Sequence, residues 1–161
     1  MPPPSLERYT IIDTETTGFS PKQNRVIEVG AIRVEAGRVV AEYQALIQTV
    51  ERVPAAITRF TGITTAMVKN DGQDPFRVFA HVRELVGDDL FVAHNVYFDF
   101  NFLNAEFARE ELPLMQNLRV CTARLAKTAL PHLPNHQLGT IKNHLDLDFQ
   151  SHRALTDETR A

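Results

Sequence analysis

Two carboxylates that stand two positions apart supply the first recognisable chemistry in this sequence. Asp13 and Glu15 lie in the stretch YTIIDTETTG, residues 9–18, directly after a short apolar run typical of a β-strand. Side chains alternate along a strand, so these two acids project from the same face. Apolar residues on both faces before them predict a central, buried strand, where unpaired charge is costly.

Like charges this close raise each other's pKa unless a cation lies between them. A divalent metal ion with oxygen ligands is the simplest such cation, so the pair is a candidate metal site. The alternative is an acidic turn after a strand, with ordinary turn chemistry in the following TTG.

A third acid, Asp99, lies in the stretch HNVYFD, residues 94–99. A strand that ends at His94 and a helix that starts near Tyr97 place Asp99 in the first turn of the helix, where the helix dipole favours a negative charge. The alternative is that Asp99 only stabilises the helix terminus and that His94 is a hydrogen-bonded structural residue.

A fourth acid, Asp157, lies in the stretch HRALTD, residues 152–157. A helix that begins at Arg153 presents Asp157 about one turn in, with His152 just before it. Taken alone, this segment also fits a surface helix with a charged face. Together with the three other acids, it could hold two hard cations, the recurring arrangement for displacement at phosphate. His152 could then take the proton from an attacking water.

The elements that must position these acids follow from hydrophobic patterning. Residues 25–34 and 38–48 read as strands around a turn at 35–37, so the first three strands form an antiparallel set. A short buried strand is expected at 90–93 and a brief strand at 119–121. Helices are expected at 55–60, 64–69, 75–86, 97–110, 122–130 and 137–144, with a last short helix from 153. This order predicts an α/β fold with a mixed central sheet flanked by helices.

Within the helix at 75–86, we expect Phe76, Phe79, Ala80 and Val86 to lie near the face that meets the core.

Composition predicts a single domain. The chain has 161 residues, 43% of them hydrophobic and 23% charged, which fits one globular domain at residues 9–161 after a flexible tail at 1–8. We expect a cytoplasmic protein without a membrane partner, because no apolar run has membrane-spanning length and the Pro-rich start lacks the pattern of a signal peptide. The lone Cys121 excludes an internal disulfide framework and a thiolate zinc cluster, and reads as a small core residue.

The formal net charge of −3 argues against strong binding of long polyanions. If four carboxylates belong to a metal site, the charge of the remainder rises by four to +1. We therefore expect contact with a short nucleic-acid terminus, or a tethering partner that supplies affinity.

Three motifs in order resemble those of the DEDDh (DnaQ-like) family of 3′-to-5′ exonucleases, which includes the proofreading epsilon subunit of bacterial replicative polymerase. They are D-x-E-T-T-G at 13–18, H-N-x-x-F-D at 94–99 and H-R-A-L-x-D at 152–157. The stretches V-I-E-V-G-A at 26–31 and I-T-x-x-T-G-I-T at 57–64 resemble the same family. The likeness therefore covers nearly the whole chain.

The resemblance implies an RNase H-like fold and hydrolysis of phosphodiester bonds from a 3′ end, with release of nucleoside monophosphates and two Mg²⁺ or Mn²⁺ ions per site. It matches the metal-binding acids to Asp13, Glu15, Asp99 and Asp157, and the general base to His152. The implied substrate is a single-stranded 3′ end, DNA rather than RNA, and the implied partner is a polymerase or another replication or repair subunit.

By the same analogy, Thr16, Thr17 and Gly18 would line the terminal nucleotide. Phe19, Ile63 and Phe102 are candidates for packing on the terminal bases, with plain core or loop packing as the alternative.

Two departures from the family pattern keep other functions open. The chain ends at Ala161, four residues past Asp157, where family members usually continue this helix, and a short helix would hold Asp157 less firmly. Cys121 stands where many polymerase-linked members carry an aspartate. The alternatives are a catalytically weak module that binds nucleic-acid ends, and an RNA-trimming exonuclease of the same family.

Overall fold

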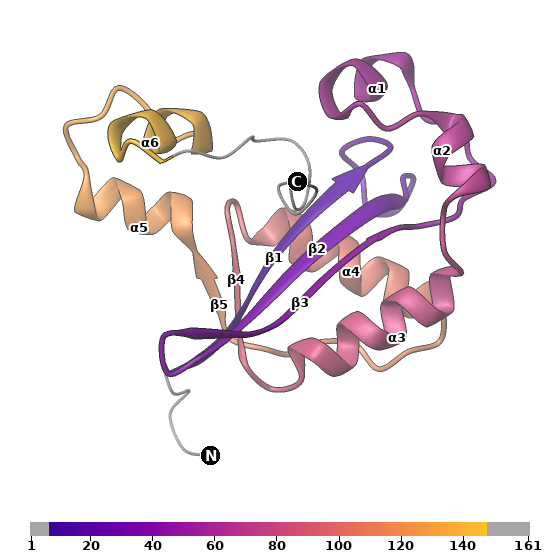
Figure 1. The fold of residues 1–161 in the computed structure, drawn as a ribbon, viewed down its shortest axis with the longest axis horizontal. Coiled ribbons are helices and arrows are strands. Elements are labelled where there is room, and N and C mark those ends of the chain that lie inside the picture. The colour runs from indigo at the N-terminus through magenta and orange to yellow at the C-terminus, as the bar shows by residue number, and fades with distance from the viewer. Residues whose placement is uncertain (1–6, 148–161) are drawn as a thin grey trace, which may run out of the picture.

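A five-stranded sheet frames the fold in residues 7–147, the part of the chain that the computed structural model describes (Figure 1). Its strand order is β3-β2-β1-β4-β5. The strands are β1 (Arg8–Thr16), β2 (Val26–Glu35), β3 (Arg38–Leu46), β4 (Leu90–Ala93) and β5 (Arg119–Cys121). The first three pair antiparallel, whereas β4 joins β1, and β5 joins β4, in parallel. The predicted mixed sheet with an antiparallel first half is confirmed.

Strand β1 is central in this sheet, as predicted, and its two faces differ. Thr10, Ile12 and Thr14 are buried on one face. On the other face, Ile11 is 39% exposed and Asp13 is exposed within the described part of the chain. The expected burial of both faces therefore applies to only one face among residues 7–147.

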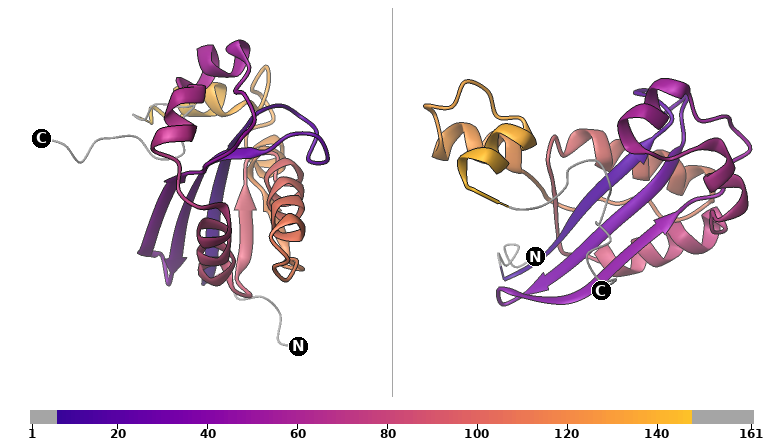
Figure 2. Two further views of the ribbon diagram at one scale, coloured as in Figure 1. Left: turned by 90° about the vertical axis from the view of Figure 1, so that its right-hand side faces the viewer. Right: turned by 45° about the horizontal axis from the view of Figure 1, so that its top comes forward.

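Six helices complete the described part of the chain, and they gather at three places around the sheet (Figure 2). Helices α3 and α4 pack on one face, where both contact β1, β2 and each other. Helices α1 and α2 lie at one end of the molecule, and α5 and α6 lie beyond β5 on the other side. The helices are α1 (Ala55–Thr61), α2 (Thr65–Asn70), α3 (Pro75–Val86), α4 (Tyr97–Arg109), α5 (Thr122–Ala129) and α6 (Leu138–His144).

Local signals in the sequence explain where α3 begins and ends. The Asp74 side chain accepts a hydrogen bond from the backbone N–H of Arg77 at 3.0 Å, and Pro75 occupies the first turn. Gly87 ends the helix with a φ of 49°, a conformation that favours glycine.

The face that α3 turns to the core differs from the predicted one at Phe76, which is 51% exposed. The buried residues of α3 are Val78, Phe79, Val82 and Val86. None of the helices within residues 7–147 is long and apolar enough to cross a membrane. The helix predicted from residue 153 lies outside the described residues.

Candidate active site

Three of the four predicted metal ligands, Asp13, Glu15 and Asp99, lie in the region where β1 ends and α4 begins. Parallel pairing of β1 with β4 places the carboxyl end of β4 beside β1, and the short turn after Ala93 leads directly into α4. Asp99 lies in the first turn of α4. Its Oδ1 accepts hydrogen bonds from the backbone N–H of Thr14 at 3.0 Å and from the Thr14 hydroxyl at 2.8 Å.

This contact fixes Asp99 on the residue that separates Asp13 from Glu15. Asp99 is only 3% exposed, so its carboxylate has little access to water and depends on hydrogen bonds within the protein. The sequence prediction that these three acids come from one strand end and one helix start is consistent with this geometry.

The electrostatics of these acids show that they lie close enough to repel one another. Burial raises the pKa of Glu15 to about 8, and the negative charges of Asp13, Glu28 and Asp99 add to the rise. Burial also raises the pKa of Asp99 to about 7, helped by the charge of Asp13 and opposed by the hydrogen bonds from Thr14. Within residues 7–147, no lysine or arginine forms an ion pair with Glu15 or Asp99.

A fourth acid at this place, Glu28, was missed by the sequence analysis. Glu28 stands directly opposite Glu15 in the β1–β2 pairing, is 1% exposed, and its Oε1 accepts a hydrogen bond from Gln44 Nε2 at 3.0 Å. The signal was present in the sequence, because a glutamate inside the apolar stretch VIEVGA is unusual unless it is paired or functional.

These acids suit a hard divalent cation in their chemistry, since carboxylate oxygens are the ligands such ions prefer. Within the described residues, no three Asp, Glu, His or Cys side chains come close enough together to form a metal-binding group. Both Asp157 and His152 lie outside these residues, so their approach to Asp13, Glu15 and Asp99 remains a prediction.

The predicted contacts to the terminal nucleotide, Thr16, Thr17 and Gly18, lie at the end of β1 and directly after it. The Thr16 hydroxyl donates to the Gly18 carbonyl at 2.6 Å, and the Thr17 hydroxyl accepts from the backbone N–H of Arg25 at 3.0 Å. A Cβ at Gly18 would lie 2.6 Å from the Asn24 side chain, so this turn is closed tightly. Hydrogen bonds thus fix the transition from β1 into the loop that follows the acids.

The three apolar candidates for base packing lie in different surroundings. Phe19, in the same loop, is 86% exposed, whereas Ile63 and Phe102 are 0% exposed. Phe102 belongs to the main core cluster and Ile63 to a smaller cluster beneath α1 and α2. The alternative of core packing is the better description of Ile63 and Phe102, and Phe19 remains a candidate for base contact.

His94 and Cys121, the other two residues named in the sequence analysis, contact neighbouring parts of the fold. His94 Nδ1 lies 3.0 Å from the Thr122 hydroxyl, and burial lowers the pKa of this histidine. Cys121 packs against the main cluster but is only partly buried, so the expectation of a core cysteine is correct only in part.

Comparison with known proteins identifies the family. The profile of the RNase_T family, described as exonuclease, matches residues 10–161. The PolC-type DNA polymerase III of Bacillus cereus is 35% identical over 152 residues, covering 94% of this chain and 10% of the polymerase. The corresponding polymerase of Bacillus subtilis is 35% identical over 153 residues, 94% of this chain and 11% of the polymerase. The chain thus spans about a tenth of the length of these relatives.

Solved structures show the same fold. Exonuclease I of E. coli, in complex with a dA16 oligonucleotide, superposes with a TM-score of 0.82 at 20% identity, over 93% of this chain and 38% of that one. Exonuclease I in a complex with SSB-Ct superposes with a TM-score of 0.79 at 18% identity, over 91% of this chain and 38% of that one. The predicted RNase H-like α/β fold is confirmed. The chain belongs to the RNase_T family of exonucleases.

Proposed function

We propose that residues 9–161 form a metal-dependent 3′-to-5′ exonuclease domain that hydrolyses phosphodiester bonds of single-stranded DNA and releases nucleoside monophosphates. The observation that carries this proposal is the attachment of Asp99 to Thr14, between Asp13 and Glu15, where burial and then the charge of Asp13 raise the pKa of Glu15. Without a bound cation, repulsion between these acids adds nothing to the free energy of unfolding. The close placement of these acids is explained if they bind a cation that the reaction requires.

Asp13, Glu15, Asp99 and Asp157 are the residues that would hold two Mg²⁺ or Mn²⁺ ions. Bound divalent cations supply the positive charge that neutralises these acids and stabilises negative charge developing at a phosphate. Thr14 keeps Asp99 in one orientation through two hydrogen bonds. His152 accepts the proton from the attacking water, which a carboxylate committed to a cation does poorly.

DNA is the favoured substrate because the relatives are DNA polymerases and exonuclease I, which shares the fold, was solved in complex with a dA16 oligonucleotide. The same relatives support a proofreading or repair role beside a polymerase. The chain's formal net charge of −3 suits a domain that engages a short 3′ end rather than a long stretch of nucleic acid.

A single assay tests this proposal. A 5′-labelled single-stranded DNA oligonucleotide is incubated with Mg²⁺ or Mn²⁺, with and without EDTA, beside an RNA oligonucleotide of the same sequence. We expect a ladder that shortens from the 3′ end on DNA, no ladder in EDTA, and none with Asp13→Ala. Faster shortening of RNA would favour an RNA-trimming enzyme. Binding without any cleavage would favour the end-binding module instead.

A further inference from the structure

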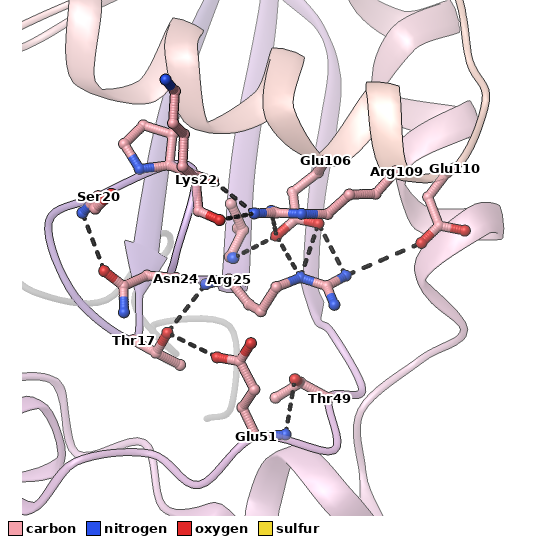
Figure 3. A network of polar contacts seen from close by, with 12 residues as sticks. Thr17, Ser20, Lys22, Asn24, Arg25, Thr49, Glu51, Glu106, Arg109 and Glu110 are labelled. Atoms are coloured by element: carbon pink, nitrogen blue, oxygen red, sulfur yellow. Dashed lines mark hydrogen bonds and ion pairs between the residues drawn. The ribbon is translucent and has the colours of Figure 1, made fainter.

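The loop between β1 and β2, residues 17–25, is held to α4 by a polar network that centres on one buried acid (Figure 3). Glu106 is 0% exposed. Arg25 Nε donates to both oxygens of the Glu106 carboxylate, at 3.0 Å each, and the backbone N–H of Val26 donates to one of them at 2.9 Å. A terminal guanidinium nitrogen of Arg25 adds an ion pair at 2.9 Å.

A second arm of the network reaches the middle of the loop. Arg109 pairs with Glu106 at 3.1 Å and donates to the backbone carbonyls of Pro21 at 2.6 Å and Lys22 at 3.3 Å. One carboxylate on α4 therefore orients both arginines, and the arginines and the carboxylate together hold the loop at its middle and at its end.

The start of the loop is tied to its end as well. The Thr17 hydroxyl accepts from the backbone N–H of Arg25 at 3.0 Å and donates to the Glu51 carboxylate at 3.3 Å. The Asn24 side chain accepts from the backbone N–H of Ser20 at 3.0 Å. Surface loops are usually the mobile parts of a fold, so this number of anchors calls for a physical reason.

The reason we favour lies in the geometry of α4. Asp99 in its first turn binds Thr14 between the two acids of β1, and Glu106, two turns later, binds the residues where the loop rejoins the sheet. One rigid helix thus sets both the acids and the loop that follows them. Phe19, 86% exposed in this loop, is presented by the anchoring of its backbone and not by packing of its ring.

Stability alone is a weak explanation for this network. A buried ion pair adds little to the free energy of unfolding compared with apolar residues of the same size, because both charges must be removed from water. What such a pair does supply is a single geometry, since the planar guanidinium and the carboxylate meet in a fixed orientation.

We propose that Glu106 and Arg25 are positioning residues that hold the 17–25 loop, and Phe19 with it, against the 3′-terminal nucleotide. This inference rests on the proposed exonuclease function. Neither residue touches the reacting phosphate, and both act through the loop.

The test compares Glu106→Gln and Arg25→Lys with a matched control, Asp89→Asn. Asp89 is 5% exposed and lies just before β4, where it forms an ion pair with Arg33 at 2.9 Å, without hydrogen-bond geometry, and a second with Arg8 at 3.5 Å. Like Glu106, it is a buried acid paired with two arginines, but it lies outside both α4 and the 17–25 loop. Arg109→Ala, at a residue whose side chain is 28% exposed, removes only the second arm.

Steady-state cleavage of a single-stranded DNA oligonucleotide should show a KM about fivefold to tenfold higher for Glu106→Gln and Arg25→Lys, with kcat within about twofold of wild type. Asp89→Asn should leave KM unchanged. In addition, Phe19→Ala should raise KM in wild type but add little in the Arg25→Lys background, because the two changes then remove the same contact. An unchanged KM in both network variants, or an equal rise in Asp89→Asn, would overturn the inference.

Hydrogen exchange separates this inference from the exonuclease proposal. Amides of residues 17–25 should exchange faster in Glu106→Gln and Arg109→Ala than in wild type, and at the wild-type rate in Asp89→Asn. Unchanged exchange in this loop rejects the positioning role even if the domain is an active nuclease. A wild-type protein that neither binds nor cleaves 3′ ends rejects the exonuclease proposal, and the positioning role falls with it.

Discussion

Helix α4 carries two buried acids that lie in opposite electrostatic surroundings. Glu106, near its carboxyl end, is ion-paired with Arg25 and Arg109. Asp99, in its first turn, has its hydrogen bonds from Thr14 but, within residues 7–147, no cationic side chain in ion-pair contact. The same helix thus buries one acid with its counter-charge and one without it.

This difference shows which of the two acids has a counter-charge among residues 7–147 and which has none there. Burying an ionised carboxylate is costly unless a cation accompanies it. At Glu106 the sequence supplies two arginines for that purpose. At Asp99 and Glu15 burial raises the pKa values to about 7 and about 8, which is the expected response of acids that leave water without a neighbouring positive charge.

The most direct test of this contrast removes one negative charge from the acids at the end of β1 and the start of α4. Glu15→Gln keeps the shape of the side chain but loses the negative charge. We expect kcat/KM for DNA cleavage in Mg²⁺ to fall roughly a hundredfold or more, because a cation ligand contributes several kcal/mol to transition-state stabilisation. Cleavage rates of purified protein, measured beside Asp13→Ala, provide the test, and wild-type activity in Glu15→Gln would place the cation elsewhere.

The same substitution at the two acids should have opposite effects on stability. Glu106→Gln leaves Arg25, whose side chain is 22% exposed, without its main counter-charge, so we expect a loss of about 2 to 4 kcal/mol in the free energy of unfolding. Glu15→Gln relieves repulsion, so in EDTA at pH 8.5 we expect a gain on the order of 1 kcal/mol after solvent screening.

Denaturant unfolding of both variants and of wild type in EDTA measures these two signs. If both substitutions destabilise the protein to a similar degree, the acids at the end of β1 and the start of α4 are an ordinary structural cluster and the comparison fails.

The sequence allowed the plan of strands and helices to be predicted, because that plan depends on local patterns. Alternation along residues 9–18 placed Asp13 and Glu15 on one face, and the Asp74 cap with Gly87 bounded α3. The bond between Asp99 and Thr14 joins residues 85 positions apart. Its existence follows only from the parallel pairing of β1 with β4.

The features that were missed depend on long-range packing. The Glu106 network needs Arg25, which is 81 positions away, and Glu28 meets Glu15 only through the β1–β2 register. Phe102 was a candidate for packing on the terminal bases by family resemblance, yet the packing of α4 against the sheet buries it completely. Similarly, Phe76 reads as apolar and helical, but the rotation of α3 about its axis turns it to solvent.

The smallest effect that we predict is the pH dependence of stability without metal. Its sign follows from the raised pKa values of Glu15 and Asp99. Glu15 and Asp99 have folded-state pKa values raised to about 8 and about 7, above the values near 4 of an unfolded chain. The folded protein therefore holds protons that the unfolded chain has released. The stability that these protons supply is full below about pH 4 and declines as the pH rises through 7 and 8.

In EDTA, we thus expect the contribution of this pair to lower the Tm by a few °C between pH 5.5 and 8.5. Glu15→Gln should flatten that slope, whereas Asp89→Asn should keep it, and both can be followed by thermal unfolding at matched ionic strength. With Mg²⁺ the slope should shrink or reverse, because ionised carboxylates bind the cation and binding stabilises the folded state. If Mg²⁺ left the Tm unchanged at pH 8.5, the raised pKa values would be a cost of burial alone, and the contrast between Glu15 and Glu106 would carry no information about a metal.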